Sequence, residues 1–401
     1  MKIIEWTAKN GKRVDYYDYG KAIPPYPKSE YIIDAQFEKY RYHQGVGDMW
    51  PLTWGMDDNI YTAGGDNRSN AMNFWRVKGE PGAWRGIYQD GWALDCINEL
   101  PLDPIEYCKD PRVHRTMGLK PAGLLDIRGT LFFAVSCQNY GVSADKYGYD
   151  ISNYTEEHFF NRQTNINGWI IVSRDYGKTW QKDATPMDFF TGRLASCHFL
   201  QFGKGYKDTR GDGYVYAYFN ASDESKSYWE NGDYMLLGRV PAGHWFICLE
   251  MLNRQSWEFY IGMDENNNTI WSKDDNEAIP VFRYNKMTGE NHVSYNKDIK
   301  RYILGNYGFV DEEVRPRPNH QGIWPESALR SQLTLYEAPE PWGPWSLFYQ
   351  DDNWGTYGNY QPSFPTKWMY NNGRTMWMVS SGTFDDYNFC VQRLDIKVKD
   401  D

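Results

Sequence analysis

The chain has 401 residues, 24% of them charged, and a formal net charge of −10. Nucleic acids and anionic membranes bind proteins through a basic footprint, so this charge argues against both as partners. No run of about 18 apolar residues occurs, which predicts the absence of a transmembrane helix. Aromatic residues make up 17% of the chain, a share that favours β-sheets.

The N-terminal segment, residues 1–45, differs from the rest of the chain. It lacks the apolar core of a signal peptide, which leaves either a cytoplasmic protein or the mature part of a secreted one. We expect residues 1–45 to form a closing strand and a loop. Residues 46–398 are expected to form one domain, because no Ser/Gly-rich linker divides them. The oligomeric state stays open.

Short apolar or alternating runs recur from residue 48 onward, broken by Gly, Asn, Asp and Pro. They form units of roughly 60–80 residues. The units open near residues 48, 120, 196, 292 and 361. Each begins with a short strand, continues with a strand rich in aromatic residues, and ends in an outer hairpin. Five such units predict an all-β fold, a five-bladed β-propeller in a single domain.

Residues 173–180, Ser-Arg-Asp-Tyr-Gly-Lys-Thr-Trp, fit the Asp-box pattern S-x-D-x-G-x-T-W. An Asp-box is a tight turn of an outer β-hairpin. Its Asp accepts hydrogen bonds from turn amides, and its Gly takes a backbone angle that a side chain resists. The pattern indicates a propeller blade and assigns no reaction. Because it marks the rim of the second unit, we expect the chemistry at the inner ends of the blades.

Polar residues collect where the units open, while the residues after them are apolar. The first strand of each propeller blade lines the central channel, so these positions predict a ligand site at the propeller axis. The opening residues are Asp48, Lys120, His198, His292 and Gln361.

Three acidic residues are candidates for acid–base chemistry. Asp48 precedes a strongly apolar strand, Asp66 ends the second strand of the same unit, and Glu290 opens the fourth unit. A glycosidase needs two carboxyl groups that flank the scissile bond, so we predict Asp48 with Glu290 or Asp66 as the catalytic pair. Asp57 and Asp58 are interpreted as the turn between the first two strands.

Further side chains are predicted to bind a substrate. They are Trp50, His114, Lys120, Arg193, His198, His292 and Gln361. The basic groups and histidines also fit a polysaccharide lyase, which neutralises a uronate carboxylate and removes a proton with a His, Tyr or Lys base. No CxxC pair, HExxH motif or P-loop occurs, so we predict no cofactor and no metal site. A structural cation in the channel is left open.

The first unit resembles the opening blade of a known family. Residues 48–54, Asp-Met-Trp-Pro-Leu-Thr-Trp, and 59–66, Asn-Ile-Tyr-Thr-Ala-Gly-Gly-Asp, are similar to the DUF 4185 group. That group is glycoside hydrolase family 183, whose activity is that of an endo-D-arabinanase. Further segments that carry the resemblance are residues 120–125, 233–241, 342–345 and 360–363.

The resemblance implies a five-bladed propeller and hydrolysis of an arabinan-like furanoside by paired carboxylates. It carries over Asp48 first and Asp66 next, and it does not fix the second carboxylate. Residues 140–167 form a long insertion that could cover the channel and alter the substrate. We therefore expect a glycoside hydrolase that acts on a polysaccharide or oligosaccharide. A polysaccharide lyase and a non-catalytic glycan-binding propeller are the alternatives.

Overall fold

The computed structural model describes residues 2–7, 13–18, 22–65, 72–81, 92–100, 117–139, 164–229, 231–243, 249–310, 330–354, 359–382 and 388–399. These residues form β-strands joined by turns and by short 3-10 helices. None of the helices in this part of the chain has the length and apolar character that crossing a membrane requires.

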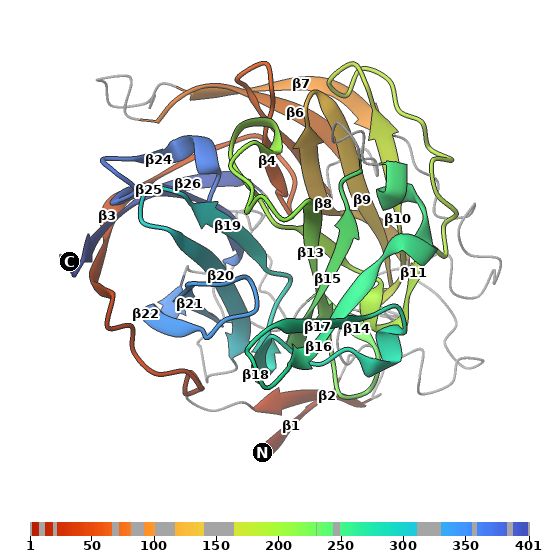
Figure 1. The fold of residues 1–401 in the computed structure, drawn as a ribbon. Helices are drawn as coiled ribbons and strands as arrows, with labels where there is room; N and C mark the ends of the chain where they lie inside the picture. Colours follow the sequence, from red (N-terminus) through yellow and green to blue (C-terminus); the bar gives the residue numbers. More distant parts are fainter. Residues whose placement is uncertain are drawn as a thin grey trace.

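Five antiparallel sheets are arranged around a central axis, which confirms the predicted all-β, five-bladed β-propeller (Figure 1). We number the blades I to V in chain order. Blade I contains β4 (Leu52–Trp54), β5 (Ile60–Gly64), β6 (Met72–Gly79) and β7 (Trp92–Leu100). Blade II contains β8 (Met117–Ile127), β9 (Thr130–Asn139), β10 (Thr164–Ser173) and β11 (Phe190–Thr191), and β14 (Ser227–Tyr228) pairs with β10.

The remaining blades share the same plan. Blade III contains β12 (Cys197–Phe199), β13 (Tyr214–Ala221), β15 (Gly232–Pro241), β16 (Glu258–Met263) and β17 (Thr269–Ser272), and β18 (Phe282–Thr288) pairs with β15. Blade IV contains β19 (His292–Asn296), β20 (Arg301–Val310), β21 (Arg330–Ala338) and β22 (Ser346–Trp354). Blade V contains β23 (Tyr360–Ser363), β25 (Thr375–Ser381), β26 (Phe389–Val398) and β3 (Ile32–Gln44), and β24 (Met369–Tyr370) pairs with β25.

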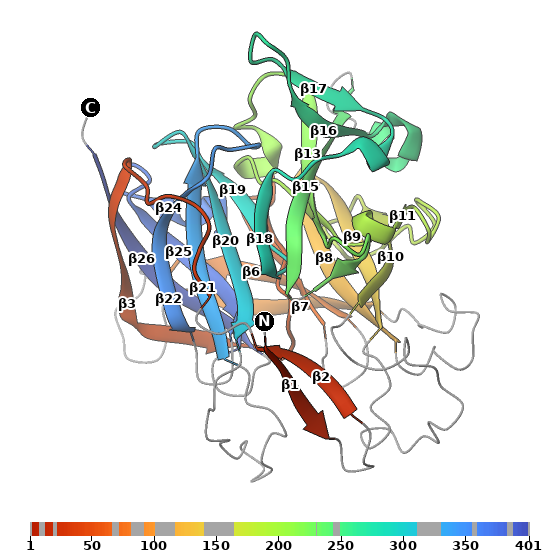
Figure 2. The same ribbon diagram turned by 90° about the horizontal axis from the view of Figure 1, so that it is seen from below.

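The outermost strand of blade V comes from the other end of the chain. β3 runs antiparallel to β26, with Ile32 opposite Val398 and Gln44 opposite Phe389. Blade V, the last blade along the sequence, is therefore completed by a strand that lies before blade I in the sequence. β1 (Lys2–Thr7) and β2 (Arg13–Asp18) pair with each other outside the blades (Figure 2). The β16–β17 hairpin extends from the opposite end of the ring.

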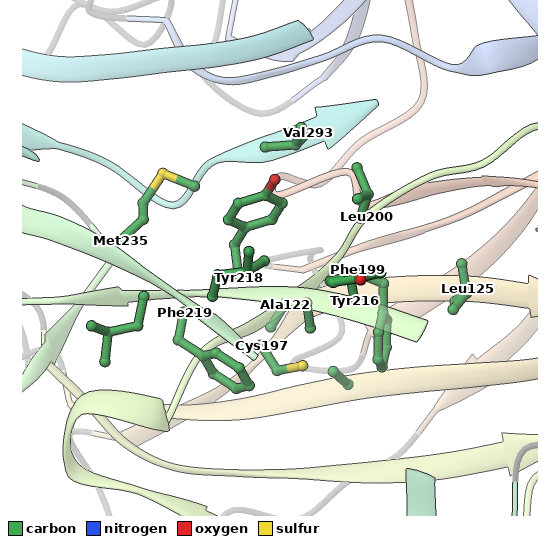
Figure 3. Close-up of a cluster of buried hydrophobic side chains, with 14 of the residues drawn as sticks. Ala122, Leu125, Cys197, Phe199, Leu200, Tyr216, Tyr218, Phe219, Met235 and Val293 are labelled. Atoms are coloured by element: carbon green, nitrogen blue, oxygen red, sulfur yellow. The ribbon is translucent and has the colours of Figure 1, made fainter. Parts of the chain in front are cut away.

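The apolar core lies between neighbouring sheets. Figure 3 shows part of it between blades II, III and IV, with Leu125 of β8, Phe199 of β12, Tyr218 of β13, Met235 of β15 and Val293 of β19. A strand that contacts another sheet on both faces is apolar at successive positions, which explains the continuous apolar run on β9. Burial of these side chains packs the sheets against one another and brings their first strands together at the axis.

The turn at residues 173–180 belongs to blade II and packs against blade I. Ser173 Oγ donates to Asp175 Oδ1 at 2.8 Å, and the Thr179 amide donates to the same oxygen at 2.9 Å. Gly177 has a φ of +86°, and a Cβ atom at this position would lie 2.1 Å from Cε1 of Phe74 on β6. The turn therefore needs glycine for its backbone angle and for its close approach to blade I.

Replacing Gly177 by alanine tests this contact, with Gly211→Ala as the matched control. Both residues have a positive φ, +86° and +79°, so alanine adds about 1–2 kcal/mol of strain at either position. A Cβ at Gly211 has nothing within 4 Å, whereas one at Gly177 overlaps Phe74. We expect urea denaturation to give Gly177→Ala a free energy of unfolding about 1–3 kcal/mol below that of Gly211→Ala. Equal losses would contradict the contact.

Candidate functional site

The first strands of the blades meet around the axis. β8 contacts β4 and β12, and β19 contacts β12 and β23. The polar residues predicted at the openings of the blades thereby fall into one buried cluster, which we call the axial cluster. Its predicted members are Asp48, Lys120, His198, Glu290, His292 and Gln361. Two further predicted residues, Asp66 and His114, lie outside the described residues.

Asp48 is fixed by its backbone and by two side chains. Its amide donates to the Gly65 oxygen at 2.9 Å, and the Gly65 amide donates back at 2.8 Å, which extends the β4–β5 pairing by one bridge. The Lys120 ammonium lies 3.3 Å from Oδ1, and the Tyr360 hydroxyl donates to Oδ2 at 3.1 Å. The Asp48 and Lys120 side chains are only 7% and 2% exposed. A cation this close stabilises the charged form of a buried carboxyl group.

Glu290 lies at the opening of blade IV and is fully buried. Its amide donates to the Trp229 oxygen at 2.9 Å. Its Oε1 atom accepts hydrogen bonds from Asn165 Nδ2 at 2.8 Å and from Ser196 Oγ at 2.6 Å. Its Oε2 atom accepts one from Gln361 Nε2 at 3.0 Å. Asn165 belongs to blade II, Ser196 directly precedes the first strand of blade III, and Gln361 belongs to blade V. Glu290 therefore joins four blades.

The environments of the two carboxyl groups differ. Burial raises the pKa of Glu290 to about 7, although hydrogen bonds from Ser196 and Asn165 lower it. The positive charge of Lys120 also lowers this pKa, and the negative charge of Asp48 raises it. Glu290 thus carries a proton under mildly acidic conditions, whereas the Asp48 carboxylate is held in an ion pair. General acid–base chemistry uses carboxyl groups whose environments favour different protonation states.

Two neutral imidazoles complete the cluster. The His198 and His292 rings lie 5.0 Å apart between centroids, edge to face. Burial lowers the pKa of His198 well below its usual value, and the neighbouring His292 lowers it further. Burial also lowers the pKa of His292 to about 4. His198 Nε2 lies 2.8 Å from Ser196 Oγ, which connects this histidine to Glu290.

Two predicted binding residues are placed outside the axial cluster. Trp50 is 1% exposed, its indole N–H donates to the Asn388 oxygen at 2.9 Å, and its ring packs edge to face on Phe389. Arg193 comes after β11, and its guanidinium donates to the backbone oxygen of Asp275. In the described part of the chain, neither side chain is hydrogen-bonded to Asp48 or Glu290. Substrate binding by these two residues remains a prediction from sequence.

Three members of the cluster were not among the candidates predicted from sequence. Ser196 stands two residues before His198 at the start of a strand, and this same-side spacing is a signal that could have identified it. Tyr360 directly precedes Gln361. Asn165 gives no signal in the sequence, because its hydrogen bond to Glu290 spans residues 125 positions apart.

A raised pKa alone does not mark this site. Asp126 is also buried, and its burial raises the pKa of its carboxyl group to about 7. It stands six residues beyond Lys120 on β8, roughly 20 Å along the strand. The Gly129 amide donates to its Oδ1 at 3.0 Å, so Asp126 shapes the turn between β8 and β9. This position makes Asp126 a suitable control for the axial carboxyl groups.

The axial carboxyl groups are occupied by donors of the protein itself. Asp48 faces Lys120 and Tyr360, and Glu290 faces nitrogen and hydroxyl donors on both of its oxygens. Among the described residues, no group of three or more His, Cys, Asp or Glu side chains is placed to hold a metal ion. Donors of the protein therefore satisfy both carboxyl groups in this structure.

No protein-family model matches the sequence, and no curated protein matches it. Solved structures do match. A glycosyl hydrolase from Bacteroides ovatus is 10% identical, with 92% of this chain and 94% of that chain covered at a TM-score of 0.41. A protein of unknown function from Dyadobacter fermentans is 12% identical, with 94% and 100% covered at 0.44. The GH43_1 enzyme from Xanthomonas citri, solved with xylose, is 10% identical, with 94% and 93% covered at 0.38.

Several of the matched structures are thus described as glycoside hydrolases. Identities and TM-scores this low carry no argument about the activity of this chain. The similarity to the DUF 4185 group therefore remains a prediction from sequence.

A double-mutant cycle tests the Asp48–Lys120 ion pair. Lys120→Met leaves the charge of Asp48 buried without this cation, so we expect it to lower the free energy of unfolding by about 3–5 kcal/mol at slightly alkaline pH. Asp48→Asn in the same molecule removes that charge, and the double variant should be more stable than Lys120→Met alone. Urea denaturation measures all four proteins. Losses that simply add would show that the two side chains are not coupled.

Proposed function

We propose that the protein is a glycoside hydrolase that cleaves a polysaccharide or oligosaccharide at the propeller axis. The observation that supports this most is the presence of two buried carboxyl groups with different environments in the axial cluster. Burial raises the pKa of Glu290 to about 7, and Asp48 forms an ion pair with Lys120. Glycosidic bond cleavage needs one carboxyl group that donates a proton and one that is ionised.

Glu290 is the proposed general acid. Its Oε1 atom already accepts two hydrogen bonds, whereas Oε2 accepts one, from Gln361. Oε2 therefore has room for the proton that goes to the leaving oxygen of the sugar. In the absence of substrate the Gln361 amide covers this oxygen, so substrate binding must displace that amide. Gln361 has a φ of +53°, a strained angle for a residue with a side chain.

Asp48 is the proposed ionised partner, as the base for a water molecule or as the nucleophile. Lys120 and Tyr360 hold its two oxygens from blades II and V. Tyr360 also belongs to an aromatic group, with its ring 5.3 Å from that of the half-buried Trp229. The apolar face of a sugar ring stacks on aromatic rings such as these. Trp229 also links this aromatic group to Glu290, because its backbone oxygen accepts the hydrogen bond of the Glu290 amide.

A neutral furanoside polymer such as an arabinan is the substrate class that we favour. The similarity to the DUF 4185 group supports it, and a net charge of −10 suits a neutral glycan better than a polyanion. The same cluster contains Lys120, Tyr360 and two histidines, which are residue types of a polysaccharide lyase. However, the Lys120 ammonium already faces the Asp48 carboxylate, so its charge does not compensate a uronate of the substrate.

Conservative variants of the two carboxyl groups test the proposal. We expect Asp48→Asn and Glu290→Gln each to lower kcat/KM on the cleaved glycan by about 10²–10⁴-fold, because each removes a proton-transferring or charged group. Asp126→Asn is the matched control, since Asp126 is a buried carboxyl group of raised pKa outside the cluster. It should keep activity within a few-fold. Each inactive variant must keep the circular dichroism spectrum of the wild-type protein, which shows that it is folded. Wild-type turnover in both axial variants would rule out the assignment.

The pH dependence of activity gives a second test. A general acid works only in its protonated form, and the pKa of Glu290 is raised to about 7 by burial. Activity should therefore fall as the pH rises through about 7, with the loss following one proton. Initial rates between mildly acidic and alkaline pH measure this fall, which is the alkaline limb of the pH profile. A rate that stays constant across this range would contradict Glu290 as the acid.

A further inference from the structure

Ser196 is the shared member of two short contacts inside the axial cluster. Its Oγ atom lies 2.6 Å from Glu290 Oε1 and 2.8 Å from His198 Nε2. All three side chains are fully buried. The roles of donor and acceptor in this chain of hydrogen bonds come from counting hydrogens, because a hydroxyl group has one hydrogen to donate.

The Glu290 end fixes the direction of the chain. Oε1 also accepts a hydrogen bond from Asn165 Nδ2 at 2.8 Å, so this oxygen is surrounded by donors and is a poor place for the carboxyl proton. The Ser196 hydrogen therefore points to Oε1. The remaining contact of Ser196, with His198 Nε2, must then be donated by the imidazole ring.

The direction of the chain also fixes the tautomer of His198. Burial keeps the imidazole neutral, so it has a single ring proton to place. Among the described residues, Nδ1 meets the criteria of no hydrogen bond, although the Ala122 backbone oxygen acts on the ring as an acceptor and raises its pKa. The tautomer is therefore decided by the contact between Ser196 and Glu290. Because the Ser196 hydrogen points to Oε1, the ring proton belongs on Nε2.

We propose that His198 and Ser196 are positioning residues that form a directed donor chain, from His198 Nε2–H to Ser196 Oγ–H to Glu290 Oε1. The chain holds Oε1 as an acceptor and leaves Oε2 as the oxygen that carries the catalytic proton. The catalytic part of this inference depends on the proposed function; the hydrogen-bond direction does not. Neither residue needs to contact the substrate.

Groups outside the donor chain also act on Glu290. Their effects must be distinguished from the effect of the donor chain. Asp48 and Lys120 act on it through their charges, and His292 packs edge to face on the His198 ring. The Ser196 hydrogen bond lowers the pKa of Glu290. Loss of the hydroxyl should therefore raise that pKa, while the charges of Asp48 and Lys120 stay in place.

The direction of the chain is measured by nuclear magnetic resonance of the full-length protein labelled with ¹⁵N-histidine. The protein has seven histidines, so the spectrum is sparse, and His198→Asn assigns the signal. We expect Nε2 to show the shift of a protonated nitrogen and Nδ1 that of an unprotonated one. We also expect the Nε2 shift to change in one step as Glu290 titrates near pH 7.

Two variants separate the chain from an electrostatic effect through space. Glu290→Gln should remove the step, and Ser196→Ala should remove it while Glu290 remains. Ser196→Thr keeps the hydroxyl and should restore it. A proton on Nδ1, no step in the wild type, or a step that persists in Ser196→Ala would each overturn the proposal.

The activity profile adds a readout that a purely structural role would not change. Ser196→Ala should move the alkaline limb of activity upward by about one pH unit, the value of one hydrogen bond to a charged group, and Ser196→Thr should return it. An unmoved limb in Ser196→Ala would overturn the catalytic part of the proposal. A protein that cleaves no glycan would refute the proposed function, yet the His198 spectra would still decide the direction of the chain.

Discussion

The burial of the Glu290 carboxyl group is the constraint on which the axis of this molecule depends. A carboxyl group removed from water is unfavourable unless donors surround it. Its donors come from Asn165, Ser196 and Gln361, on three different blades, and its backbone bonds to Trp229. No single sheet can satisfy it. The site therefore exists only when the ring is assembled, and apolar packing between the sheets supplies the driving force for that assembly.

The same arrangement gives the two carboxyl groups of the cluster different environments. Asp48 meets a lysine, and Glu290 meets neutral donors and apolar surroundings. A cation favours the charged form of a carboxyl group, whereas removal from water favours the neutral form. The contrast arises from the choice of neighbours at the openings of the blades. Burial lowers the pKa of both histidines of the cluster, so neither adds positive charge near neutral pH.

The fold could be predicted because most strands of a propeller blade come from residues that are close together in the sequence. Apolar strands separated by turn residues repeat along the chain, and the Asp57–Asp58 turn lies between β4 and β5 as expected. The polar residues at the blade openings were predicted for a related reason, since each precedes its own apolar strand. The contacts among them were not, because they join positions such as Asn165 and Glu290 that are distant in sequence. The position of Trp50 in the core between blades I and V also depends on contacts between residues that are distant in sequence, such as Trp50 and Phe389.

The central claim is that the propeller axis hydrolyses glycosidic bonds. The most direct test is a product analysis of the wild-type protein on a panel of polysaccharides that includes D-arabinan and uronic-acid glycans. The account predicts new reducing ends from a neutral polymer, with no ultraviolet absorbance from unsaturated sugars. Unsaturated products released from a uronate glycan would contradict it in favour of β-elimination. Binding without cleavage at every pH would contradict it in favour of a glycan-binding propeller.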